Sequence, residues 1–286
     1  MVKQKEYLNF TLLNIGHAIH NADWNWSKVS SPFTRLYWVE GGAAKIILPS
    51  GTYNLTPNHL YLIPSFTLHS YVCDGYFSLY YIHIYEEQVG TLSLIEQLNF
   101  PVEVEATDTD VLLIRRLLKI NPNRALKLYD PSLYDNSQTL LRNISENQQL
   151  PYYLIIETKG ILQQLFSRFL KMAEMRLEIT DNRLLNVLRY IRKNINKTIT
   201  IGQLSALCFL TDDHFIKLFK KEMKCTPIQY INQKKIERAQ VMLIIDDLPI
   251  KEIAYNLAFN NISYFNKLFK SVTGLTPSEY KKPSYV

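Results

Sequence analysis

The sequence predicts a two-domain α+β protein, with a β-rich N-terminal domain that ends in helices and an all-α C-terminal domain. Three observations predict this class. Short β-branched and aromatic runs alternate with turn residues from Phe10 to about Tyr85. Apolar residues then recur at helical spacing from about Thr107. Finally, the stretch from Ile201 to Tyr280 contains one helical pattern twice.

The N-terminal strands are short and regularly interrupted. Gly41-Gly42 and Pro49-Ser50-Gly51 are the strongest turn signals. Many short strands with regular turns predict a sandwich or a small barrel. The clearest runs are F-T-R-L-Y-W-V, A-K-I-I-L, G-T-Y-N-L, H-L-Y-L-I-P and Y-F-S-L-Y-Y-I-H-I.

Two helices are expected to follow the strands. The run V-L-L-I-R-R-L-L-K has a helical period, and Asn121-Pro122 stops it. A longer helix opens at Leu150-Pro151 and runs to about Glu178 with a broad apolar stripe. That stripe either packs on the β domain or forms a subunit interface.

A short polar break at Ile179 to Asn182 predicts the domain boundary, which divides residues 1–179 from residues 180–286. Charge is unevenly distributed across it. The chain has 32 Lys+Arg and 26 Asp+Glu, and from Asp181 onward we count 17 basic and 9 acidic residues. A basic C-terminal third on a near-neutral body is typical of proteins that bind the phosphate backbone of nucleic acids.

The duplicated stretch has the pattern of two helix-turn-helix units. Ile201 matches Ile250 at a spacing of 49, whereas Phe215 and Phe219 match Phe265 and Phe269 at a spacing of 50, so the second copy has one extra residue near its turn. Each copy is a short amphipathic helix, a tight turn and a second helix with lysines on its outer face. Helix N-caps are expected at Thr211 and at Asn261 or Ser263. A helical hairpin used only for packing is the disfavoured alternative.

These residues resemble the DNA-binding domain of the AraC family of bacterial transcription regulators. The resemblance rests on Y-F-N-K-L-F-K from Tyr264 and G-L-T-P-S-E-Y from Gly274, and it covers roughly Asn182 to Lys282. It implies two helix-turn-helix units joined by one long helix, here Thr226 to about Ile245. The family usually has glycine in the turns, where this chain has Phe209 and Ala258.

The run from Tyr53 to Pro64, followed by His69, is similar to the cupin-like sensor domain that often precedes this DNA-binding half. His59 replaces the family glycine. The resemblance implies a cupin-like β-barrel that senses a ligand, and a helical segment at residues 151–178 through which the protein dimerises.

Residues that read DNA are expected on the outer face of each second helix, near its N-terminal half. Asn266 is suited to a bidentate contact with adenine, and lysine to guanine O6 and N7. Ser263 and Tyr264 are alternatively phosphate contacts, and Asp212 and Asp213 interact favourably with the helix dipole. The resemblance implies these DNA-binding residues: Asp213, Ile216, Lys217, Lys220, Lys221, Ser263, Tyr264, Asn266, Lys267 and Lys270.

The N-terminal domain is expected to hold a small polar ligand, because aromatic faces with a few polar groups suit a sugar, another metabolite or an aromatic acid. No metal or cofactor is expected, since neither the histidines nor Cys73, Cys208 and Cys225 show metal-binding spacing. The expected ligand-binding residues are Trp24, Trp26, Arg35, Trp38, His69, Tyr81 and His83.

The predicted function is a sequence-specific transcription regulator that is not an enzyme. It would act on a promoter operator in double-stranded DNA, as a homodimer under control of a small effector, and would contact RNA polymerase if it activates. The absence of a long apolar run predicts a cytoplasmic protein without a membrane span. The alternatives are a cupin-type metalloenzyme fused to a helical domain, and a repair or architectural DNA-binding protein.

Overall fold

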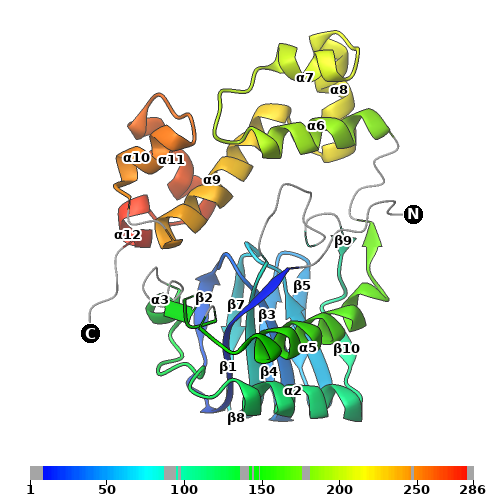
Figure 1. Ribbon diagram of the computed structural model, residues 1–286, viewed down its shortest axis with the longest axis vertical. Helices are drawn as coiled ribbons and strands as arrows, with labels where there is room; N and C mark the ends of the chain where they lie inside the picture. Colours follow the sequence, from blue (N-terminus) through cyan, green and yellow to red (C-terminus); the bar gives the residue numbers. More distant parts are fainter. Residues whose placement is uncertain are drawn as a thin grey trace. The chain divides into compact units, whose positions relative to one another are not determined.

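A computed structural model describes residues 9–86, 95, 98–135, 142–143, 145–147, 149–175, 181–245 and 248–281. These residues fall into two compact units, one drawn from Met1–Glu87 and Phe100–Glu174 and the other from Gln88–Asn99 and Met175–Lys282. The predicted domain boundary lies at residues 179–182. Residues 179 and 180 are outside the described part of the chain. We call the two compact units the β unit and the helical unit (Figure 1).

The β unit contains two antiparallel sheets. The five-stranded sheet has the order β1-β8-β3-β6-β10, and the four-stranded sheet has the order β2-β7-β4-β5. All five strand runs predicted from the sequence form strands, and the predicted turn at residues 49–51 separates β4 from β5. The strands are β1 (Phe10–Asn21), β2 (Trp26–Val29), β3 (Thr34–Gly42), β4 (Ala44–Leu48), β5 (Gly51–Leu55), β6 (His59–Ile63), β7 (His69–Val72), β8 (Tyr76–Glu86) and β10 (Glu103–Glu105).

The cupin-like barrel that the resemblance implied is not confirmed. Among the described residues, no strand pairing joins the two sheets, so the β unit is a sandwich rather than a barrel. One apolar cluster between the sheets includes Val39 and Leu79 from the first sheet and Ile46 and Leu55 from the second. The sheets are therefore held together by side-chain packing instead of a continuous hydrogen-bond ladder.

Helices α2 (Asp108–Ile120) and α5 (Tyr152–Leu170) pack on the outer face of the five-stranded sheet (Figure 1). Thr107 caps α2 through a capping box with Asp110, and Asn121 ends the helix as predicted. Helix α5 ends at Leu170, short of the expected Glu178, and residues 176–180 lie outside the described part. Phe166 of α5 meets Phe10 of β1 edge-on at 5.0 Å. A short helix, α3, covers Pro131–Tyr134. The two-residue strands β9 (Leu98–Asn99) and β11 (Glu174–Met175) pair with each other.

The helical unit contains the predicted duplication. Its elements are α6 (Asn182–Lys193), α7 (Ile201–Leu207), α8 (Asp212–Met223), α9 (Pro227–Ile245), α10 (Ile250–Asn256), α11 (Ile262–Thr273) and α12 (Pro277–Lys281). Helices α7 and α8 form the first helix-turn-helix unit, and α10 and α11 form the second (Figure 1). Helix α9 ends at the predicted Ile245, and residues 246–247 lie outside the described part of the chain. In the described part of the chain, no helix is both long and apolar enough to cross a membrane.

Helix α9 contributes to two separate cores. Ile231, near its start, belongs to a cluster with Phe215 and Phe219 of α8. Ile236 and Leu243, farther along, belong to a second cluster with Phe265 and Phe269 of α11. The four phenylalanines are each fully buried, so both second helices are fixed by the same pair of aromatic positions.

Both turns contain a non-glycine residue in the left-handed region. Phe209 has φ 55° and Ala258 has φ 53°, at the positions where the sequence lacks the expected glycines. A side chain at such a φ costs roughly 1–2 kcal/mol. The extra residue of the second copy therefore lies after this position, because Phe209 and Ala258 are 49 residues apart.

We expect Ala258→Gly to raise the free energy of unfolding of the helical unit by about 0.5–1 kcal/mol, because relief of the positive φ outweighs the added entropy of the unfolded chain. Urea unfolding followed by circular dichroism at 222 nm measures the change. The matched control is Ala206→Gly in α7, which should destabilise by about 0.5–1 kcal/mol. A loss of stability in Ala258→Gly equal to that of the control would contradict the assigned backbone conformation.

Candidate functional site

The second helix of each helix-turn-helix unit begins at a side-chain cap. Thr211 accepts a hydrogen bond from the backbone N–H of His214 at 3.4 Å, and Asn261 accepts one from the N–H of Tyr264 at 3.0 Å. Each cap satisfies one of the free N–H groups at the helix start. The caps confirm Thr211 and select Asn261 over Ser263, and they fix the first turn, where base-reading side chains are expected.

The structure places nine of the ten predicted DNA-binding residues on exposed faces of α8 and α11. Most of them lie on the side of the helix opposite the buried phenylalanines, and Tyr264 and Asn266 flank Phe265. The nine are Asp213, Lys217, Lys220 and Lys221 on α8, and Ser263, Tyr264, Asn266, Lys267 and Lys270 on α11. Their role in DNA binding stays a prediction.

Two residues of α8, Ile216 and Asp212, contact other side chains of the first unit. Ile216 is half-buried and packs against the core formed by Phe215 and Phe219, so its side chain is only partly available to a ligand. Asp212 accepts a hydrogen bond from Ser205 of α7. This bond ties the start of α8 to α7 and gives the Asp212 carboxylate a structural partner in addition to the helix dipole.

Tyr264 is held in place by the long helix. Its hydroxyl accepts a hydrogen bond from Nδ2 of Asn232 on α9 at 2.9 Å, and its ring lies 6.2 Å from that of Phe259. Since Tyr264 accepts here, its own O–H remains able to donate to a phosphate oxygen. Sequence reasoning missed Asn232, because nothing in the local pattern of α9 indicates a partner 32 residues away.

Two basic side chains hold the turns. Arg183 of α6 donates to the carbonyl oxygen of Cys208 at 3.1 Å, next to Phe209. Lys235 of α9 is buried, and its Nζ lies 3.5 Å from the carbonyl oxygen of Ala258 and 5.2 Å from the ring of Phe259. Burial lowers the pKa of Lys235. Lys235 is therefore a buried contact of the second turn and is not exposed to a ligand, whereas the exposed Arg183 binds the first turn and pairs with Asp181 at 2.6 Å.

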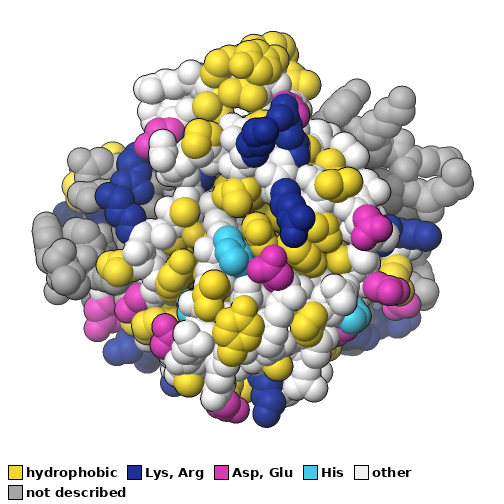
Figure 2. All heavy atoms as spheres, turned by 90° about the horizontal axis from the view of Figure 1, so that it is seen from below, with side chains coloured by type: hydrophobic (Ala, Val, Ile, Leu, Met, Phe, Trp, Pro, Cys, Tyr) yellow, Lys and Arg dark blue, Asp and Glu magenta, His cyan; other side chains and the backbone are white. Residues whose placement is uncertain are grey.

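Charged side chains of both signs are mixed with hydrophobic ones on the face shown in Figure 2. The lysines on α8 and α11 instead recur at helical spacing on one side of each helix. Such a one-sided arrangement is what an element that enters a groove requires.

Most of the predicted ligand-binding residues gather inside the β unit. Trp24, Tyr81 and His83 line a cavity of about 20 Å³, together with Tyr37 and Tyr134. This volume is room for roughly one water molecule. Trp26 packs against the same interior cluster, and Arg35 pairs with His83 across strands β3 and β8.

Trp38 does not join them. Successive side chains of a strand point to opposite faces of the sheet. Trp38 therefore lies on the face opposite Tyr37, where its ring is 5.0 Å from that of Tyr80 and 5.8 Å from the guanidinium of Arg115 on α2. The sequence run F-T-R-L-Y-W-V did not show which of its aromatic residues faces the second sheet.

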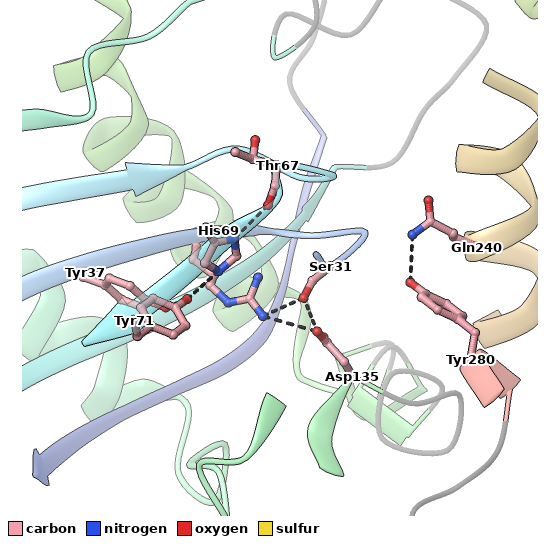
Figure 3. Close-up of polar contacts among 9 residues, drawn as sticks. Ser31, Tyr37, Thr67, His69, Tyr71, Asp135, Gln240 and Tyr280 are labelled. Carbon is pink, nitrogen blue, oxygen red and sulfur yellow. Dashed lines mark hydrogen bonds and ion pairs between the residues drawn. The ribbon is translucent and has the colours of Figure 1, made fainter. Parts of the chain in front are cut away.

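A chain of hydrogen bonds connects His69 with two tyrosines (Figure 3). His69 Nδ1 contacts the carbonyl oxygen of Thr67 at 2.7 Å and therefore carries the proton, which leaves Nε2 to accept from Tyr71 at 2.7 Å. The Tyr71 oxygen then accepts from Tyr37 at 2.7 Å. Burial, with the nearby positive charge of Arg35, lowers the pKa of His69 to about 3, so this histidine is neutral at pH 7.

Arg35 is 1% exposed and has an acidic partner that the sequence analysis did not identify. Its Nη2 donates to Ser31 Oγ at 2.6 Å and to Asp135 Oδ2 at 3.3 Å, and Ser31 in turn donates to Asp135 (Figure 3). Burial raises the pKa of Asp135 to about 6, although Arg35 opposes this shift. Asp135 lies 100 residues from Arg35, beyond the reach of any local sequence signal. Within the described ranges, no group of three or more His, Cys, Asp or Glu side chains is placed to hold a metal ion.

Comparisons with known proteins support the helix-turn-helix assignment of the helical unit. Residues 204–283 match a family described as "Helix-turn-helix domain". The chain carries an AraC-type helix-turn-helix domain. The chain is 29% identical to a probable transcriptional regulator, LumQ, of Photobacterium leiognathi over 111 residues. This stretch is 39% of this chain and 42% of that protein. It is 33% identical to the bifunctional transcriptional activator/DNA repair enzyme AdaA of Bacillus subtilis over 98 residues. This stretch is 34% of this chain and 46% of that protein.

The match to a solved structure extends over almost the whole length. ToxT from Vibrio cholerae, with an unsaturated fatty acid bound, aligns over 96% of both chains with a TM-score of 0.51 and 17% identity. At this identity the likeness shows a shared fold, with a sheet-rich unit and a helical unit. The chain spans less than half the length of the two regulators that it matches in sequence.

The neutral His69 predicts a pH dependence for the β unit. Its folded pKa of about 3 lies below the ordinary value of 6.5, so its contribution to stability is present above pH 6.5 and is lost as the pH falls toward 3. We expect the stability advantage of wild type over His69→Gln to shrink by roughly 2–3 kcal/mol between pH 7 and pH 4.5.

Tryptophan fluorescence during urea unfolding measures this difference, because all three tryptophans, Trp24, Trp26 and Trp38, belong to the β unit. Other groups that titrate in this range, Asp135 included, are common to both proteins and largely cancel in the comparison. An advantage that stays constant with pH would show that His69 is not buried in its neutral form.

Proposed function

We propose that the protein is a sequence-specific, DNA-binding transcription regulator of the AraC type. The observation that carries this proposal is the duplicated helix-turn-helix unit, in which α8 and α11 are each capped at the N-terminus, buried on one side by two phenylalanines and exposed on the other. An α-helix with one free face fits the major groove of DNA. The basic charge of the C-terminal third favours a polyanionic partner.

The exposed residues divide between base reading and phosphate contact. Asn266 can pair with adenine through two hydrogen bonds, and Lys217 or Lys267 can donate to guanine. Tyr264, fixed by Asn232, is better suited to a phosphate, since its hydroxyl can donate but cannot form a bidentate pair. The first unit offers Asp213 and a half-buried Ile216 at the corresponding turn, so it would contribute more backbone contact than base reading.

The β unit is the sensor in this proposal, with residues 1–179 as the sensing domain and 180–286 as the DNA-binding domain. The fold shared with ToxT, whose structure holds an unsaturated fatty acid, supports control by a small molecule. A ligand that binds one arrangement of the domains more tightly would shift the population of DNA-binding molecules.

Exposed apolar residues of α5 support a homodimer. Tyr152, Tyr153 and Ile156 are exposed although α5 also has a fully buried face, and such residues commonly mark interfaces. The regulator would act in the cytoplasm and contact RNA polymerase as an activator. Sedimentation equilibrium tests the dimer, and a monomer at micromolar concentration in the presence of DNA would contradict it.

We expect Asn266→Ala and Lys267→Ala each to weaken operator binding by about 1–3 kcal/mol and to relax the preference at one base pair, because each removes a base contact. The operator is first selected from random duplexes with the wild-type protein, and fluorescence anisotropy then measures affinity for the matched site and for its single-base variants.

The matched control is Lys119→Ala, which removes one exposed lysine from α2 of the β unit. It should leave both affinity and base preference unchanged. If Asn266→Ala and Lys267→Ala keep the wild-type preference at every position, the assignment of α11 as a base-reading helix is wrong.

A further inference from the structure

The guanidinium of Arg35 is buried with incomplete pairing. It is 1% exposed, yet among the described residues its Nε has no hydrogen-bond partner. The Asp135 oxygen that does not face Arg35, Oδ1, is likewise buried without a partner. A buried ion pair repays its desolvation only when its geometry is excellent and its remaining polar atoms are satisfied. The Arg35–Asp135 pair meets neither condition.

The free Nε of Arg35 lies on the side of the guanidinium that can bind a carboxylate. Nε and Nη2 are the two donors along one side of a guanidinium, and a carboxylate can bind that side through two parallel hydrogen bonds. Asp135 reaches only Nη2, at 3.3 Å, and shares it with Ser31. Arg35 is therefore held in the protein interior with one half of a bidentate carboxylate site unused.

A second unpartnered group lies beside it. His83, 1% exposed, pairs directly with Arg35 in the β3–β8 register, and its Nδ1 has no hydrogen-bond partner in the described part of the chain. His69 is not available, because both of its ring nitrogens are used by Thr67 and Tyr71. Two buried donors, Arg35 Nε and His83 Nδ1 in the appropriate tautomer, are thus free at neighbouring positions.

The surroundings are aromatic, and Tyr134, the last residue of α3, is among the residues that line the cavity. His83 lines the small cavity with Trp24, Tyr37 and Tyr81, and its ring is stacked 5.2 Å from that of Tyr134. Tyr134 and Asp135 are adjacent in the chain, so a residue that lines the cavity is next to the one that pairs with Arg35. Movement of these two residues would open an aromatic slot and free the guanidinium edge at the same time.

We propose that this cluster is a binding site for a small aromatic carboxylate, whose carboxyl group replaces Asp135 on Arg35 while its ring takes the place of Tyr134. The proposal rests on the sensor role given above to the β unit and names its ligand class. It favours an acid over a sugar, because a buried guanidinium with a free edge recognises a planar anion better than a neutral hydroxyl. Asp135 acts as the internal competitor that holds the site closed.

Calorimetric titration of the full chain with benzoate, in the absence of DNA, tests the proposal. We expect saturable binding of benzoate, with benzamide and acetate at least tenfold weaker, because the first lacks the charge and the second lacks the ring. Asp135→Asn keeps the size of the side chain and removes the competing charge, so it should bind benzoate at least tenfold more tightly than wild type. That gain should disappear in the Asp135→Asn/Arg35→Gln double variant.

Tryptophan emission and circular dichroism establish that each variant is folded, and Asp135→Asn alone decides the question if the double variant does not fold. Benzoate binding that is absent from both wild type and Asp135→Asn, unchanged by Asp135→Asn, or matched by benzamide or acetate overturns the proposal. Operator binding by the same preparations is measured separately. Its loss would refute the regulator function, whereas a negative benzoate result with intact operator binding refutes only the ligand class.

Discussion

The helical unit depends on one constraint, which is that helix α9 belongs to two hydrophobic cores at once. Ile231 packs into the first core and Ile236 into the second. These residues are five positions apart, which is about 140° around an α-helix. The two cores therefore lie on different sides of one continuous rod. Because a helix does not twist freely between two packed faces, the orientation of α8 relative to α11 is fixed by the sequence of α9.

Polar contacts strengthen the same constraint. Asn232 holds Tyr264, Lys235 lies against the second turn, and Gln240 donates to Tyr280 of α12 at 3.1 Å (Figure 3). All three come from α9 and reach the second unit. Because Asn232, Lys235 and Gln240 are polar residues that make contacts within the protein, the inward-facing positions of α9 do not form a single apolar face. These contacts also show that a lysine in a basic region need not be a DNA contact, since Lys235 is buried.

The C-terminal unit was largely predictable because its signals are local and occur twice. The caps at Thr211 and Asn261, the buried phenylalanines and the bounds of α9 all follow from spacing along the chain. The β unit was predictable only as a set of strands. Whether its sheets close depends on edge pairing between distant strands, which no single run encodes. Which aromatic residues share a cavity depends on which face of a strand each occupies, as Tyr37 and Trp38 show. Asp135 could not be paired with Arg35, since 100 residues separate them.

The two units use charged side chains in different ways. In the helical unit, Arg183 and Lys235 stabilise turns that lack glycine. In the β unit, Arg35 is paired incompletely, so its partner can be exchanged. The first arrangement gives rigidity to the elements that meet DNA, and the second leaves a site whose occupancy can change.

Hydroxyl-radical footprinting of the selected operator tests most directly whether α9 presents both reading helices to one duplex. The account predicts two protected patches on the same face of the DNA, about 34 Å or one helical turn apart. Two patches on opposite faces, or a single patch covering one half-site, would contradict it.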